Sequence, residues 1–239
     1  MPSLTVLVDQ IASMRENARN VGPDPVSVAV VAELAGADGI GAYMREDRRY
    51  VNEQDLRLLR QTVHGRLIVH MAPTSEMVGV ALDIKPERVV IVPELGENGP
   101  AEDGLDLMMH GDRIFETIDT LQSNGISGSV SITAEPEQAK LAHQIGATWC
   151  QIHAGRLQSA TTPASQTQAL NKIIDTIKMA HKLRLRIAVG GGLNYRLIQL
   201  FKSLHEIDEF SLGYHLITRA VLKGMEPAIQ EMIGLIRTL

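Results

Sequence analysis

The stretch Arg186-Ile187-Ala188-Val189-Gly190-Gly191-Gly192 shows the unit from which the fold is built. A short apolar run ends abruptly in three glycines, which is typical of a buried parallel strand that ends at a tight turn. A segment of helical period, 194–204, follows, and a second short strand, 209–212, ends at Gly213. The sequence therefore predicts a strand, a helix and another parallel strand at this point.

The same alternation extends outward over the whole chain. The predicted strands cover 4–9, 38–44, 67–72, 88–92, 128–133, 148–153, 186–189 and 209–212, and the predicted helices cover 25–34, 52–63, 75–84, 112–122, 136–144, 167–182, 194–204 and 216–239. Eight such units in 239 residues predict a TIM (β/α)8 barrel as one domain over residues 1–239. The alternative is an open Rossmann-like sheet, but no G-x-G-x-x-G follows the first strand.

The composition indicates how the core is packed and which partners are excluded. Apolar residues make up 44% of the chain and aromatic residues only 3%, so aliphatic side chains form the predicted core. The net charge of −5, without a basic stripe, argues against a nucleic-acid partner. We find no signal peptide and no apolar run of about 18 residues, so we expect a cytoplasmic protein without a membrane partner.

Glycines at two neighbouring strand ends point to a phosphorylated ligand. In a barrel of this type, phosphate is often held after strands seven and eight, where Gly192 and Gly213 lie here. Glycine lets backbone N–H groups approach an anion closely, and the N-terminus of the following helix adds positive potential. The alternative is that these glycines only form tight turns.

Other polar residues occupy further strand ends. Asp9 ends the first predicted strand, and the charged run Arg45-Glu46-Asp47-Arg48-Arg49 follows the second. This run forms either a loop that binds the ligand or a loop that is only solvated. Arg15 and Arg19 lie four residues apart and share a face if that segment is helical.

Alternation along a strand places three further polar residues at the barrel mouth. His70 lies in the third predicted strand, and Gln151 and His153 share one face of the sixth. These residues either contact a ligand or are structural residues with hydrogen-bond partners in the protein. Cys150 then faces the helices and is expected to be inert. The histidines lack the spacing of a metal site, so we predict no metal.

Several motifs, in order along nearly the whole chain, resemble those of the pyridoxine 5′-phosphate synthase family. The most specific is the block from Ala35 to Arg49. Others are Val8-Asp9-Gln10-Ile11-Ala12, Asn17-Ala18-Arg19, Pro23-Asp24-Pro25, Lys85-Pro86, Val92-Pro93-Glu94, Gly104-Leu105-Asp106, Ile152-His153, Gly192-Leu193-Asn194-Tyr195 and Arg219-Ala220-Val221.

The resemblance implies a barrel with extra helices that assembles into a homo-oligomer, typically an octamer. It also implies the condensation of 1-deoxy-D-xylulose 5-phosphate with 3-amino-2-oxopropyl phosphate, which yields pyridoxine 5′-phosphate, inorganic phosphate and water without a redox cofactor or a metal. The residues that match the family's substrate-binding positions are Asp9, Arg19, Arg45, Gly192 and Gly213.

The family's catalytic positions are all substituted in this chain. By the resemblance, Tyr43 replaces a proton-accepting histidine, His70 a catalytic glutamate, Gln151 a glutamate that assists the transition state, and Gly191 a proton-donating histidine. Gln10, Tyr50 and Tyr214 likewise replace substrate-binding histidines, Leu7 replaces an asparagine, and Pro100 stands at a threonine of the loop from Pro93 to Gly104.

These substitutions remove groups that transfer protons. Tyr, with a pKa of about 10, and Gln, which does not titrate, are poor replacements for His or Glu. His70 is the best remaining acid or base. Three functions stay open: an altered but active synthase, a diverged barrel enzyme for another phosphorylated molecule, and a non-catalytic paralogue that binds a phosphorylated ligand. The substitutions favour the last two.

Overall fold

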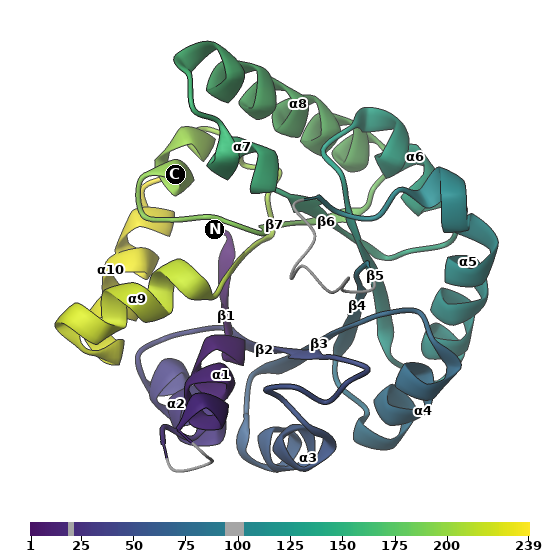
Figure 1. Ribbon diagram of the computed structural model, residues 1–239. Helices are drawn as coiled ribbons and strands as arrows, with labels where there is room; N and C mark the ends of the chain where they lie inside the picture. Colours follow the sequence, from purple (N-terminus) through teal and green to yellow (C-terminus); the bar gives the residue numbers. More distant parts are fainter. Residues whose placement is uncertain (19–21, 94–102) are drawn as a thin grey trace.

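Eight parallel strands pair in sequence order into a closed barrel in the computed structural model, which describes residues 1–18, 22–93 and 103–239. The barrel closes where β1 pairs with β8, with Thr5 opposite Ser211. Figure 1 shows the ring of strands with the helices packed around its outside. The predicted TIM barrel is therefore confirmed. The strands are β1 (Ser3–Leu7), β2 (Gly39–Met44), β3 (Arg66–Met71), β4 (Arg88–Ile91), β5 (Ser127–Ile132), β6 (Trp149–His153), β7 (Arg186–Gly190) and β8 (Glu209–Leu212).

Helices connect the strands, and several of them are additional to the simple alternation. The described residues form α1 (Asp9–Asn17), α2 (Pro25–Leu34), α3 (Glu53–Thr62), α4 (Ser75–Ile84), α5 (Leu107–Ser123), α6 (Pro136–Gln144), α7 (Gly155–Ser159), α8 (Pro163–Lys182), the 3₁₀ helix η1 (Leu197–Phe201), α9 (Tyr214–Lys223) and α10 (Met225–Ile236). None of these helices is both long and apolar enough to cross a membrane.

Local capping explains most of the helix starts. The Asp24 carboxylate accepts hydrogen bonds from the N–H groups of Val26 and Ser27 (both 3.2 Å), and Pro25 occupies the first turn, as its fixed φ allows. Asn52 forms a capping box with Asp55 at the start of α3. The sequence predicts both caps, because Asp24 and Asn52 stand where the two helical segments begin, and the structure confirms them.

Four predicted boundaries were wrong, two of them because a capping residue starts the helix earlier. The first strand ends at Leu7, and Asp9 begins α1. Helix α5 begins at Leu107 rather than residue 112, because Asp106 caps it. Helix α8 begins at Pro163 rather than residue 167, because Thr162 forms a capping box. The segment 194–204 contains only the five residues of η1.

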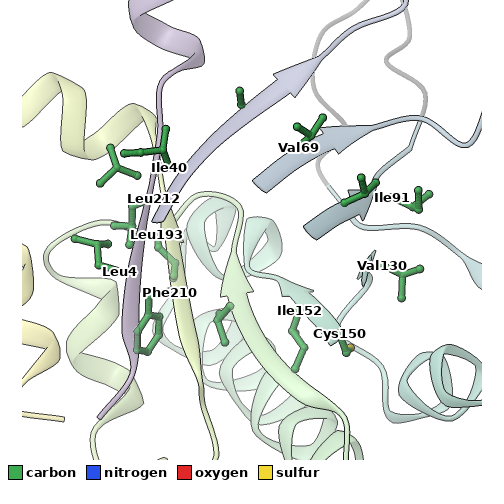
Figure 2. Close-up of a cluster of buried hydrophobic side chains, with 14 of the residues drawn as sticks. Leu4, Ile40, Val69, Ile91, Val130, Cys150, Ile152, Leu193, Phe210 and Leu212 are labelled. Atoms are coloured by element: carbon green, nitrogen blue, oxygen red, sulfur yellow. The ribbon is translucent and has the colours of Figure 1, made fainter. Parts of the chain in front are cut away.

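The outward faces of the strands carry the hydrophobic core. Leu4, Ile40, Ile152 and Phe210 are buried between the barrel and the surrounding helices, as Figure 2 shows. Cys150 lies in the same layer and is fully buried, as predicted. Burial raises the pKa of its thiol to about 12, so it stays protonated and unreactive.

The inward face at the amino-terminal end of the barrel is charged. Arg88, which is 4% exposed, donates to the Glu209 carboxylate, which is 1% exposed. Arg66 Nη1 lies 3.6 Å from the same carboxylate. The Arg88 guanidinium also stacks on the Trp149 ring, 3.9 Å from its centroid, and Arg186 stacks on that ring at 4.4 Å. Burial lowers the pKa of Arg88, and the adjacent Glu209 charge opposes that effect.

Removing one partner of this buried pair should strongly destabilise the barrel. Glu209→Gln leaves the Arg88 charge without a buried counter-charge, for which the expected cost is about 3–5 kcal/mol in the free energy of unfolding. Urea denaturation followed by circular dichroism measures this. The control is Asp83→Asn, which breaks a pair with Arg57 whose side chains are 58% and 59% exposed and should cost at most about 1 kcal/mol. Equal midpoints for the two variants would contradict the role of the buried pair.

Candidate functional site

Two adjoining cavities lie at the carboxyl ends of the strands. The first, which we name the glycine pocket, measures about 550 Å³. The second, the inner cavity, measures about 300 Å³. They share Leu7, Gln10, His153 and Gly191, so together they form one mouth.

The glycine pocket joins the ends of β7 and β8. Gly192 has a φ of +82°, a conformation that L side chains adopt with strain, and Gly213 directly precedes α9. No side chain caps this helix, and Tyr214, which is 60% exposed, begins it at the rim of the pocket. The buried Ser211 hydroxyl also lines the pocket and has no hydrogen-bond partner among the described residues. Such a concave, glycine-lined helix start suits an anion.

Two residues of the glycine pocket were missed by sequence reasoning. Gln158 of α7 lies over Gly192, and its side-chain nitrogen is 3.0 Å from Nε2 of His215 in α9. Burial lowers the pKa of His215, which keeps the imidazole neutral. These residues are 57 positions apart, and nothing in the sequence pattern of either segment indicates their contact.

The four positions that the resemblance marks as catalytic meet in the inner cavity. Tyr43 of β2 and His70 of β3 are register partners, Gln151 projects from β6, and Gly191 follows β7. The sequence prediction that these residues share the barrel mouth is consistent with this arrangement. The amide oxygen of Gln151 is buried without a hydrogen-bond partner among the described residues.

Neither titratable group among these four ionises near neutral pH. Burial, with a smaller contribution from the Arg88 charge, lowers the pKa of His70 to about 3, and its buried Nε2 has no described partner. Burial raises the pKa of Tyr43 to about 12, and its hydroxyl donates to the Pro93 carbonyl at 3.4 Å. His70 is therefore a neutral imidazole and a weak base, and Tyr43 is a neutral phenol.

His153 fills the space that a side chain at position 191 would occupy. A Cβ placed on Gly191, whose φ is +76°, would overlap the His153 imidazole. The ring is fixed by its Nδ1, which accepts the N–H of Gly155 at 3.2 Å. The imidazole of the neighbouring strand β6 thus occupies the space beside Gly191.

Asp9 faces the inner cavity at the start of α1. Its Oδ1 accepts the backbone N–H of Tyr43 at 2.5 Å, which holds the carboxyl across the β1–β2 junction. Burial raises its pKa to about 6, against the lowering effect of this and another backbone hydrogen bond. Asp9 therefore titrates close to physiological pH.

The arginines near the mouth divide into two groups. Arg45 lines the inner cavity together with Tyr50, but two of its three side-chain nitrogens, Nε and Nη2, donate to Asp47 at 2.8 and 2.6 Å. Arg48 pairs instead with two glutamates outside the cavity, so the charged run only partly faces the site. Arg15 binds the Asp55 carboxylate through both terminal nitrogens at 2.7 Å and braces α1 against α3.

Some predicted residues lie outside the described ranges. Arg19 is one, and residues 94–102 of the loop from Pro93 to Gly104, with Pro100, are the others. The two described flanks of this loop, Pro93 and Asp103, line the inner cavity. Within the described ranges, no group of three or more His, Cys, Asp or Glu side chains could hold a metal ion.

Comparisons with known proteins identify relatives and fold neighbours. A family model described as "Pyridoxal phosphate biosynthesis protein PdxJ" matches residues 4–238. The chain is 40% identical over 239 residues to a pyridoxine 5′-phosphate synthase of Desulforapulum autotrophicum, covering 100% of both chains. It is 42% identical over 232 residues to a pyridoxine 5′-phosphate synthase of a Cyanothece species, covering 97% of both. KGPDC from Streptococcus mutans shares the fold, with a TM-score of 0.68, 15% identity and coverage of 99% and 98%.

A side chain at Gly192 should weaken anion binding at the glycine pocket. Gly192→Ala places a methyl group against Gln158 and moves a backbone N–H away from an anion, and the loss of one charge-assisted hydrogen bond costs about 1.5–3 kcal/mol. Titration calorimetry with inorganic phosphate should show at least about a tenfold loss of affinity.

The matched control is Gly146→Ala. Gly146 has a similar φ of +75°, but a Cβ there meets open space, away from the mouth. Both variants should lose about 1–2 kcal/mol of stability to backbone strain. Phosphate affinity that falls equally in both, or in neither, would contradict an anion site at the glycine pocket.

Proposed function

The chain belongs to the family of pyridoxal phosphate biosynthesis protein PdxJ, and from this membership we propose that it binds a phosphorylated small molecule in its mouth with strongly reduced synthase activity. The glycine pocket holds the phosphate, and the inner cavity holds the body of the ligand. Inorganic phosphate competes for the same pocket.

The glycine pocket supports the binding half of this proposal. Gly192 and Gly213 border it, helix α9 starts beside it directly after Gly213, and the Ser211 hydroxyl in it has no hydrogen-bond partner among the described residues. Buried polar groups require partners, and an anionic ligand supplies acceptors for the hydroxyl and for backbone N–H groups. Asp9, Gln10, Arg45, Tyr50 and Tyr214 border the rest of the bound molecule.

The single observation that carries the loss of synthase activity is the chemistry of the inner cavity. Of the four positions that the resemblance marks as catalytic, two cannot titrate and the other two have pKa values of about 3 and about 12. Ring closure needs a base beside a carbonyl and an acid at a leaving group, both with a pKa near ambient pH. A diverged reaction on another phosphorylated molecule, or binding alone, accounts better for these residues.

Exposed apolar side chains favour a homo-oligomer. Leu34 on α2 and Leu222 on α9 are 82% and 81% exposed, which is costly for an isolated subunit. We also propose self-association, with an octamer as the family's typical assembly; analytical ultracentrifugation would test it.

The direct test measures pyridoxine 5′-phosphate and free phosphate after purified protein is mixed with the two synthase substrates. Each lost acid–base group costs roughly 10²–10⁴-fold. We therefore expect turnover at least about 10²-fold below that of the Desulforapulum autotrophicum relative, assayed in parallel. Turnover equal to that of the relative would refute the proposed loss.

A second measurement separates binding from catalysis. Titration of the protein with 1-deoxy-D-xylulose 5-phosphate should show saturable binding that inorganic phosphate competes away. Failure of both titrants to bind would refute the proposed ligand class, irrespective of the turnover result.

A further inference from the structure

We propose that Asp9 is the proton-transfer residue of this mouth, and that its carboxylate removes a proton from a carbon next to the carbonyl group of the bound ligand. The inference rests on the proposed function, because it requires a phosphorylated carbonyl compound in the inner cavity. It assigns to Asp9 a chemical role in addition to contact with the ligand.

Geometry places the carboxyl where a reacting atom can meet it. Asp9 begins α1 directly above β1, and it borders the inner cavity with Tyr43, His70 and Gln151. One oxygen, Oδ1, is held by the Tyr43 N–H at 2.5 Å. This hydrogen bond comes from the backbone, so the carboxyl stays in place when a ligand displaces neighbouring side chains.

No described basic side chain neutralises this carboxylate. Within the described residues, Asp9 forms no ion pair within 4.0 Å, although Arg45 borders the same cavity. The Arg45 guanidinium instead pairs with Asp47, whose two carboxylate oxygens accept from its Nε and Nη2. An unpaired carboxylate in a partly dry cavity is a stronger base than one held in a salt bridge.

The electrostatic surroundings support the same role. Burial raises the pKa of Asp9 to about 6, which lies in the range where a general base is effective. The charged or titratable groups that line the same cavity are Tyr43 of β2, Arg45 and Tyr50 of the segment after β2, His70 of β3, His153 of β6, and Asp103, with Glu46 and Asp47 beside Arg45. His70, with a pKa of about 3, cannot compete as a base.

The proposed step balances without a cofactor. The Asp9 carboxylate takes H⁺ from the carbon next to the carbonyl, the C–H electron pair forms a C=C bond, and the carbonyl π pair moves onto oxygen. The neutral Tyr43 hydroxyl borders the same cavity, and by turning from the Pro93 carbonyl, to which it donates at 3.4 Å, it can donate its hydrogen bond to that oxygen. Return of a proton from Asp9 to the carbon completes the exchange, and in D2O the returned atom is deuterium.

The test follows this exchange directly. Saturating 1-deoxy-D-xylulose 5-phosphate is incubated with protein in D2O, and loss of the proton signal next to the ketone is followed by NMR. Wild type should exchange this proton faster as pH rises through about 6, and Asp9→Asn should lower the rate at least about 100-fold. Titration calorimetry with the same ligand should show that Asp9→Asn still binds it.

Asp83→Asn is the matched control, since it makes the same substitution at an exposed carboxylate that pairs with Arg57 outside the mouth. It should leave the rate of exchange and its pH dependence unchanged. Exchange that survives in Asp9→Asn, or that is lost equally in Asp83→Asn, would overturn the assignment. If wild type binds the ligand without exchanging it, this inference fails alone; if wild type does not bind it, the proposed function fails as well.

A stability measurement tests the ionisation of Asp9 without any ligand. The folded-state pKa of about 6 lies above the ordinary value of 3.8, so the folded protein holds this proton more tightly than the unfolded chain does. Stability due to this group is therefore complete below about pH 4 and is lost as pH rises through about 6. The unfolding midpoint of wild type should fall relative to that of Asp9→Asn across this window. A constant difference between the midpoints would also overturn the inference.

Discussion

Closing eight parallel strands into a ring creates an inside face that has to be filled, and the buried ion pair between Arg88 and Glu209 fills it at the amino-terminal end. The pair joins β4 to β8 across the barrel, and the Trp149 ring lies against the Arg88 guanidinium. Charges this deeply buried are tolerated only when they are paired. A shift in the register of β4 or β8 would separate the two charges, so the pair constrains the register of both strands.

Above this pair, several inside-facing side chains are small and polar, beside aliphatic ones such as Ile68 and Val90. Thr5, Ser129 and Ser211 are buried, and their hydroxyl groups have no hydrogen-bond partner among the described residues. A barrel that was only a scaffold would fill this space with branched aliphatic side chains, as the outward faces do. The polar interior instead leaves room and unmet hydrogen-bonding capacity below the mouth, which fits a site for a polar ligand.

Burial inverts the acid–base chemistry that the residue types suggest. His70 would ordinarily titrate near neutral pH and Asp9 well below it, yet the buried environment moves the pKa of His70 down and that of Asp9 up. Both shifts have the same cause, because burial disfavours the charged form of either group. His70, which is a base by residue type, is thus the less suitable base. Asp9, which the resemblance marks as a substrate-binding residue, is the better one.

The sequence alone determined the architecture and pointed to the end of the barrel where the candidate site lies. Alternating strands and helices, the caps at Asp24 and Asn52, and glycines after β7 and β8 are local patterns, and each depends only on neighbouring residues. The tertiary structure decided what those patterns could not show. These features are the contact of Gln158 with His215, the salt bridge between Arg45 and Asp47, and the shifted pKa values of Asp9 and His70. Periodicity depends on the order of residues along the chain. Burial, the pairing of charged side chains and their pKa values depend instead on distances through space that exist only once the barrel has closed.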